Sequence, residues 1–154
     1  MAELPYREKI MSNVEQACRG IRQDAGYHFT VREVTRQLTG PYTTGNLPSI
    51  SVYEGDEYGA IEDYYTYTRF LNVAVEMWIK EQQKGKLASE LNKMLADVEK
   101  AVLEDHTRGG EAMDTQLAEV TPPILAEGGE SEAGLVCFFI VQYRFSKQDP
   151  ARMS

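Results

Sequence analysis

The residues of this chain that most often do chemistry are few and stand far apart. There are two histidines, His28 and His106, and two cysteines, Cys18 and Cys137. Neither histidine has a cysteine or a carboxylate at the spacing of a metal-ligand pair, and no C-x-x-C is present for zinc or redox chemistry. We therefore expect surface or capping roles for the histidines. The cysteines are expected to be reduced packing residues in a cytoplasmic setting.

The motifs of common enzymes and nucleotide-binding proteins are also missing from the sequence. It contains no G-x-S-x-G, no glycine-rich phosphate loop, no H-E-x-x-H and no EF-hand pattern. The acidic stretch "EGDEYG", residues 54–59, lacks the ligand spacing of a calcium loop. We expect it to be the solvated tip of a hairpin. These observations predict a protein that is not an enzyme and that has no metal or other cofactor.

Length and composition indicate one soluble domain. The 154 residues are 42% hydrophobic and 26% charged, and 16 basic against 24 acidic residues give a net charge of -8. This charge disfavours specific nucleic-acid binding through phosphates and docking on anionic lipid. The longest apolar run, residues 135–141, is far shorter than the roughly 20 residues of a membrane span, so we expect no membrane association. The predicted domain covers residues 1–154, with an ordered core over 6–146 and a loose tail over 147–154.

The hydrophobic periodicity predicts an α+β fold. Apolar residues at helical spacing indicate helices over residues 5–25 and 87–104. Alternation and turn residues indicate five strands, over 27–38, 49–55, 62–80, 115–125 and 135–146. The order is therefore α-β-β-β-α-β-β, which is typical of a mostly antiparallel sheet of about five strands with two helices on one face.

The last predicted strand is apolar on both of its sides. "LVCFFIVQYRF", residues 135–145, places Val136, Phe138 and Ile140 opposite a second row of apolar side chains. Two helices with one apolar stripe each can cover only one sheet face, and a contiguous apolar patch left exposed usually marks a protein interface. Either copies of the chain associate through this face, or long loops of the same chain fold back over it.

Aromatic side chains are concentrated in the long strand over residues 62–80, and aromatic residues are enriched in protein interfaces. Ordinary packing within a long hairpin is the alternative explanation. The candidate subunit-interface residues are Tyr64, Tyr65, Tyr67, Phe70 and Trp78 on this strand and Val136, Phe138 and Ile140 on the last one.

Negative charge is concentrated in two predicted hairpin regions. Residues 53–64 and 109–135 contain acidic residues and no basic one. The acids could form a charged rim that keeps strand edges from aggregating, or a shared surface such as a pore wall or a patch for a basic partner. The candidate lumen-lining or partner-facing residues are Glu54, Asp56, Glu57, Glu62, Asp63, Glu127, Glu130 and Glu132.

The order of these features resembles the tail-terminator proteins of long-tailed bacteriophages. The resemblance covers residues 6–146: an N-terminal helix closing into "GYHFTVREV", then "LPSISVYEGDE" leading into "DYYTYTRFLNVAVEMWI", then "ASELNKMLADVEKAVLED" and a final hairpin ending in "CFFIVQYRF". The closing strand with its Tyr143–Arg144 pair is also similar to that family.

The resemblance implies a structural protein made in the host cytoplasm and located in the virion, at the head–tail junction. Such proteins form a hexameric ring that caps the tail tube, stops its polymerisation and presents a surface for head joining. The implied partners are further copies of the chain, the tail-tube protein and the head–tail connector proteins. DNA would pass through the ring, and an acidic wall would repel its phosphates. The alternatives are another neck, tail-completion or head-closure component, or a small-ligand-binding or enzymatic α+β domain.

Overall fold

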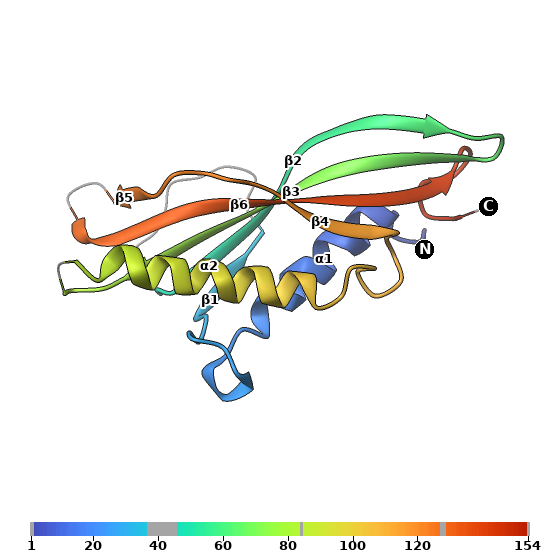
Figure 1. The fold of residues 1–154 in the computed structure, drawn as a ribbon. Coiled ribbons are helices and arrows are strands. Elements are labelled where there is room, and N and C mark those ends of the chain that lie inside the picture. The colour runs from blue at the N-terminus through green and yellow to red at the C-terminus, as the bar shows by residue number, and fades with distance from the viewer. Residues whose placement is uncertain (1, 37–45, 84, 127–128, 154) are drawn as a thin grey trace.

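The computed structural model describes residues 2–36, 46–83, 85–126 and 129–153; the side chains at 60–62, 129 and 130 also lie outside the described part. The elements run in the order shown in Figure 1. They are α1 (Tyr6–Arg19), the 3-10 turn η1 (Gln23–Ala25), β1 (Glu33–Thr35), β2 (Ser49–Glu62), β3 (Thr66–Lys80), α2 (Leu87–Leu103), β4 (Asp114–Val120), β5 (Ile124–Ala126) and β6 (Gly129–Ser146).

The strands form one mixed sheet in the order β1-β2-β3-β6-β4, and β5 also pairs with β6. All pairs are antiparallel except β1 with β2, which run parallel. The β3–β6 pair is unbroken from Thr66 opposite Ser146 to Lys80 opposite Glu132. This architecture confirms the predicted α+β class. It has one strand more than expected, because Pro122 and Pro123 fall between β4 and β5 and cannot donate to a ladder.

Both helices lie against the same face of the sheet (Figure 1). The core consists of the odd-numbered residues of β3 and β6, such as Val73 opposite Phe139, together with the apolar stripe of α2. That stripe is formed by Leu91, Met94, Val98 and Val102, all buried, and each such side chain contributes about 1.5–3 kcal/mol by leaving water. The predicted helix over 87–104 is thus confirmed, and it lies with α1 on one face of the sheet, as predicted.

The first helix is shorter than its predicted span of 5–25. It begins after Pro5 and ends at Gly20, whose amide donates to the carbonyl oxygens of Gln16 and Ala17. The chain then turns through η1, which ends at Gly26 with a φ of 93°, a conformation that glycine adopts without strain. Ile21 is buried although it lies beyond the end of the helix. Its apolar side chain continued the helical spacing, and the predicted helix was therefore too long.

The predicted strand over 27–38 is mostly wrong. Only residues 33–35 form a strand, because the backbone before them bonds to α2 instead. The Asp97 carboxylate accepts the amide hydrogens of His28 and Phe29 at 3.0 and 2.9 Å. A buried carboxylate on the helix thereby replaces the strand neighbour that this segment would otherwise need. Residues 37 and 38 lie outside the described part of the chain.

The "EGDEYG" stretch is not a hairpin tip, which corrects the prediction. It lies inside β2, whose pairing with β3 shifts register between Glu54 and Glu57 and again between Tyr58 and Ile61. These irregularities absorb the extra residues and let the strand continue. The actual turn falls between β2 and β3, next to Tyr64 and Tyr65, which were expected to extend the strand.

The last residues of the chain form turns that pack back on the fold. The Ser146 amide donates to the Arg152 carbonyl oxygen at 2.6 Å, and the Tyr6 amide donates to the Pro150 carbonyl oxygen at 3.1 Å. Ala151 is buried. The segment after β6 therefore holds the start of α1 against the end of the sheet, where the sequence alone indicated a loose tail.

Candidate functional site

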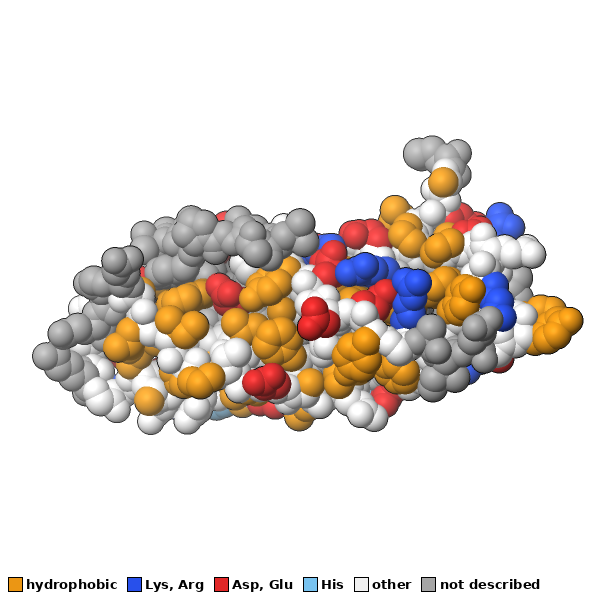
Figure 2. Space-filling view, turned by 90° about the horizontal axis from the view of Figure 1, so that it is seen from above, with side chains coloured by type: hydrophobic (Ala, Val, Ile, Leu, Met, Phe, Trp, Pro, Cys, Tyr) orange, Lys and Arg blue, Asp and Glu red, His pale blue; other side chains and the backbone are white. Residues whose placement is uncertain are grey.

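The sheet face opposite the helices carries most of the predicted interface residues. It consists of the even-numbered residues of β3 and β6, which pair across the two strands. Figure 2 views the molecule from this side, and apolar side chains are spread over it among charged ones. The paired positions are Phe70 with Gln142, Asn72 with Ile140, Ala74 with Phe138, Glu76 with Val136 and Trp78 with Gly134.

One part of this face is covered by its own chain. Trp78 is only 9% exposed and lies against Gly134, the residue opposite it on β6. Its indole nitrogen donates to Glu76 at 2.8 Å, and the hydroxyl of Tyr53 donates to the same carboxylate at 3.1 Å. Burial and the adjacent Glu76 charge raise the pKa of Tyr53 to about 12, so this hydroxyl stays a donor. Val136 is buried to a similar degree.

The remainder of the face stays partly open. Phe70, Phe138 and Ile140 are half-buried, and Tyr58 on β2 is exposed. Tyr58 and Phe70 stack with ring centroids 6.4 Å apart. We call these four residues the open patch. The chain therefore covers the Trp78 end of its second sheet face, whereas the open patch lacks such a cover within the described residues.

Tyr64 and Tyr65 protrude from the turn between β2 and β3. They are 83% and 69% exposed, and their rings meet edge to face at 4.8 Å. Tyr67 differs from them, because its ring turns toward the helix side and lies 5.8 Å from that of Phe145. The sequence pattern grouped the three tyrosines together, whereas the structure leaves Tyr64 and Tyr65 exposed and Tyr67 half-buried.

The predicted acidic residues do not form one uniform surface. Glu57 points toward the core side, where it accepts from Tyr143 at 2.7 Å and pairs with Arg69 at 3.0 Å. Burial, followed by this bond, raises the pKa of Tyr143. Glu54 pairs with Arg36 at 3.3 Å. These two carboxylates are therefore balanced by cations of their own chain.

The other predicted acids are placed differently. Asp56 and Asp63 are exposed, and Glu132 is half-buried on β6. Hydrogen bonding by Thr66, and then by the backbone amide of Tyr65, lowers the pKa of the Asp63 carboxyl group, so it is ionised at ordinary pH. Glu127 and the side chains of Glu62 and Glu130 lie outside the described part.

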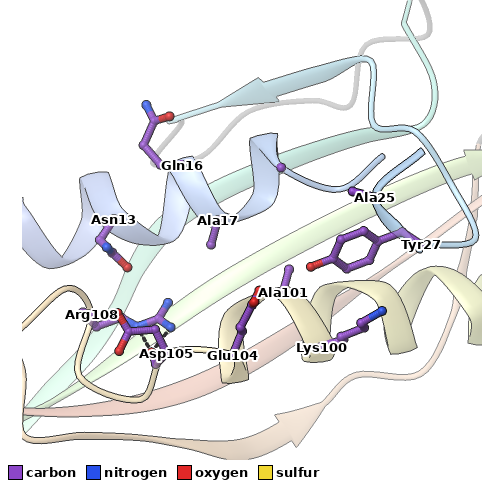
Figure 3. Close-up of a pocket in the computed structure, with 11 residues that line it drawn as sticks. Asn13, Gln16, Ala17, Ala25, Tyr27, Lys100, Ala101, Glu104, Asp105 and Arg108 are labelled. Atoms are coloured by element: carbon purple, nitrogen blue, oxygen red, sulfur yellow. Dashed lines mark hydrogen bonds between the residues drawn. The ribbon is translucent and has the colours of Figure 1, made fainter. Parts of the chain in front are cut away.

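A cavity of about 500 Å³ opens between α1 and α2 (Figure 3). The helices contribute Asn13 and Ala17 from one side and Lys100 and Glu104 from the other. Lys100 lies 4.6 Å from the centre of the Tyr27 ring and donates to the Gly26 carbonyl oxygen at 3.2 Å. Lys100 therefore links the second helix to the turn before β1 at one side of the cavity.

Arg108 at the edge of this cavity is a residue that sequence reasoning missed. It is 1% exposed, and its guanidinium donates to the carbonyl oxygens of Val102 and Asp105 at the end of α2. A cation in this position satisfies the free carbonyls and the negative end of the helix dipole. Burial lowers its pKa. The pair Gly109–Gly110 after it was the only sequence signal of this tight turn.

The side chains that commonly bind metals are scattered among the described residues. No group of three or more His, Cys, Asp or Glu residues in that part of the chain could hold a metal ion. His106 is exposed and bonds through Nδ1 to the Thr115 carbonyl oxygen at 2.7 Å, which ties the turn after α2 to β4. Within the same residues, no helix is long and apolar enough to cross a membrane.

Comparison with known proteins finds a similar fold in a solved structure. No protein-family model matches the chain, and no curated protein does. A solved structure does match: a chain of the "Virion of native gene transfer agent (GTA) particle", with a TM-score of 0.59 and 14% sequence identity. The match covers 88% of this chain and 94% of the other. At this identity the likeness establishes a shared fold.

Proposed function

We propose that this chain is a structural protein of a phage-like virion, and that it forms the ring that ends the tail tube. The observation that carries the proposal is the shared fold, which extends over nearly the whole of both this chain and a chain of a gene transfer agent virion. The order of elements that resembles tail terminators, residues 6–146, lies within the same fold.

The mechanism would be the geometry of interfaces, with no catalytic step. Copies that contact each other head to tail form a closed ring when the rotations between successive neighbours add up to a full turn, and an open filament otherwise. The open patch and the exposed tyrosines offer the apolar and aromatic surface that subunit contacts favour. One face of the ring would bind the last layer of the tube, and the other would bind connector proteins and give no site for another tube subunit.

The test is the effect of the purified chain on tube assembly. Light scattering should find a defined oligomer near six times the 17.4 kDa of one chain, formed alone or on addition of tail-tube protein. Tube subunits polymerising with the chain present should give tubes that stop growing, with lengths measured by electron microscopy. A chain that stays monomeric with tube protein and leaves tube length unchanged would contradict the proposal.

A further inference from the structure

We propose that Arg108 binds the carboxylate group of a small organic acid in the cavity between α1 and α2. Arg108 forms part of the lining of this cavity, together with Asn13 of α1 and Tyr27 (Figure 3). Arg108 and Asn13 also line a neighbouring cavity of about 320 Å³, so the guanidinium lies where the two cavities adjoin. The site needs no second copy of the chain, and it is therefore independent of the proposed ring.

The guanidinium of Arg108 has one more donor group than its own chain satisfies. Its Nε donates to the Asp105 carbonyl oxygen at 2.9 Å, and its Nη2 donates to the carbonyl oxygens of Val102 and Asp105. Its Nη1 is buried and has no acceptor among the described residues. Buried donors of charged groups are rarely left without an acceptor, because the loss of hydration is then not compensated. Nη1 therefore indicates an acceptor supplied from outside these residues.

The positive charge of Arg108 is also without an anionic partner in the part of the chain that the structure describes. Asp105 is close in sequence, but its carboxylate oxygens accept from the amide and hydroxyl of Thr107 and from the Gly109 amide, at 2.7–2.9 Å. Arg108 itself is 1% exposed, so water does little to screen it. A carboxylate would both accept from Nη1 and balance this charge, whereas a water molecule would only accept.

The rest of the cavity favours a singly charged ligand with a short apolar body. Its lining includes two cations, Lys100 and Arg108, and two acids, Glu104 and Asp105, so its formal charges sum to zero. This balance tolerates one added negative charge and disfavours the two of a phosphate dianion. The side chains of Ala17 and Ala101 and the ring of Tyr27 supply apolar wall, which suits a short alkyl chain.

The side chain of Asn13 stands beside the guanidinium and controls access to it. A Cβ built on Gly109, the residue after Arg108, would lie 3.3 Å from Asn13 Nδ2. Nη1 is enclosed, so a ligand reaches it only when the half-buried Asn13 side chain turns aside. The Asn13 amide can then donate an N–H group to the second oxygen of the carboxylate.

Thermal unfolding of the full chain tests the site, with sodium butyrate as the probe. Butyrate should raise the midpoint by about 2–4 °C near saturation, because a ligand that binds only the folded chain stabilises it. Butyramide, its uncharged analogue, and sodium chloride at the same ionic strength should leave the midpoint nearly unchanged. An equal rise with chloride or with butyramide would overturn the proposal. A larger rise with sodium phosphate would overturn the choice of a carboxylate.

Asn13→Asp places a carboxylate of the chain itself beside the guanidinium, and it leaves Arg108 in place to hold the end of α2. This variant should fold and show a response to butyrate about fivefold smaller than that of the unmodified chain, because its own acid competes for Nη1.

Gln16→Glu is the matched control for this variant. It makes the same change of amide to acid on the same helix, but Gln16 is exposed and its side chain points away from Arg108 in Figure 3. Gln16→Glu should keep the full response. Equal losses in the two variants would assign the effect to the charge of α1 and overturn the site, as would a full response in Asn13→Asp.

Discussion

At the scale of single residues, the close packing of Trp78 on Gly134 is the most constrained feature of the helix-free face. A Cβ on Gly134 would come within 2.6 Å of the Met77 carbonyl oxygen and of Trp78 Cε2. The Met77 carbonyl oxygen belongs to the backbone and cannot move aside as the end of a flexible side chain can. The two strands would therefore have to shift apart.

Gly134→Ala should therefore lower the free energy of unfolding by about 1–3 kcal/mol, the usual cost of overpacking. Urea denaturation followed by tryptophan fluorescence measures it, since Trp78 is the only tryptophan of the chain. Gly20→Ala is the control, because Gly20 has an ordinary φ of -81° and its added Cβ meets nothing closer than 3.4 Å. Equal stability of the two variants would mean that Trp78 does not pack as described.

Little at this scale could be predicted from the sequence. The apolar side chains of Trp78 and Val136 predicted a contact with another subunit. The structure instead buries Trp78 within its own chain, because the strand register places it opposite Gly134. The hydrophobic pattern sets the face on which each side chain lies, and a short turn can fix the register of a hairpin. No short turn joins β3 to β6, because α2, β4 and β5 lie between them, so the residue opposite Trp78 could not be predicted. The same applies to Glu57, whose partner Tyr143 lies 86 residues further along the chain.

At the scale of elements, the strands and helices with strong periodicity were predicted and the others were not. β3, β6 and α2 each repeat apolar residues over many turns or alternations, and each was confirmed. The β2 strand was predicted too short because its two register shifts break the alternation. The segment before β1 was predicted as strand because the pattern did not reveal that Asp97 would bond its backbone.

The two faces of the sheet should differ sharply in their contribution to the stability of one chain. Leu91→Ala, on the α2 stripe, should cost about 2–5 kcal/mol, because it leaves a cavity in the core. Ile140→Ala, in the open patch, should cost about 1 kcal/mol, the span of strand preference. Chemical denaturation at concentrations where the chain is monomeric measures both. Similar losses would show that the open patch is as well covered as the core.

At the scale of the whole molecule, the end of the chain closes the fold onto its beginning. Ending the chain after Asp149 removes the Tyr6–Pro150 and Ser146–Arg152 bonds and the buried Ala151. At about 0.5–1.5 kcal/mol for each bond, this truncation should cost about 1–3 kcal/mol in thermal or urea unfolding. Ending the chain after Arg152 keeps these contacts and should change stability by less than about 0.5 kcal/mol. A fully stable Asp149 truncation would show that the segment is dispensable.

A ribosome making this chain completes the centre of the sheet last. β6 pairs with β3, β4 and β5, and it is the final strand to be synthesised. Until β6 has been made, the edge of β3 that pairs with it has no neighbouring strand. The apolar side chains of β3 and its unpaired backbone groups are then exposed and prone to aggregation. The pairing of β3 with β6 also joins residues far apart in sequence, which slows folding. The sheet can therefore be completed only after β6 has been made and has paired with β3.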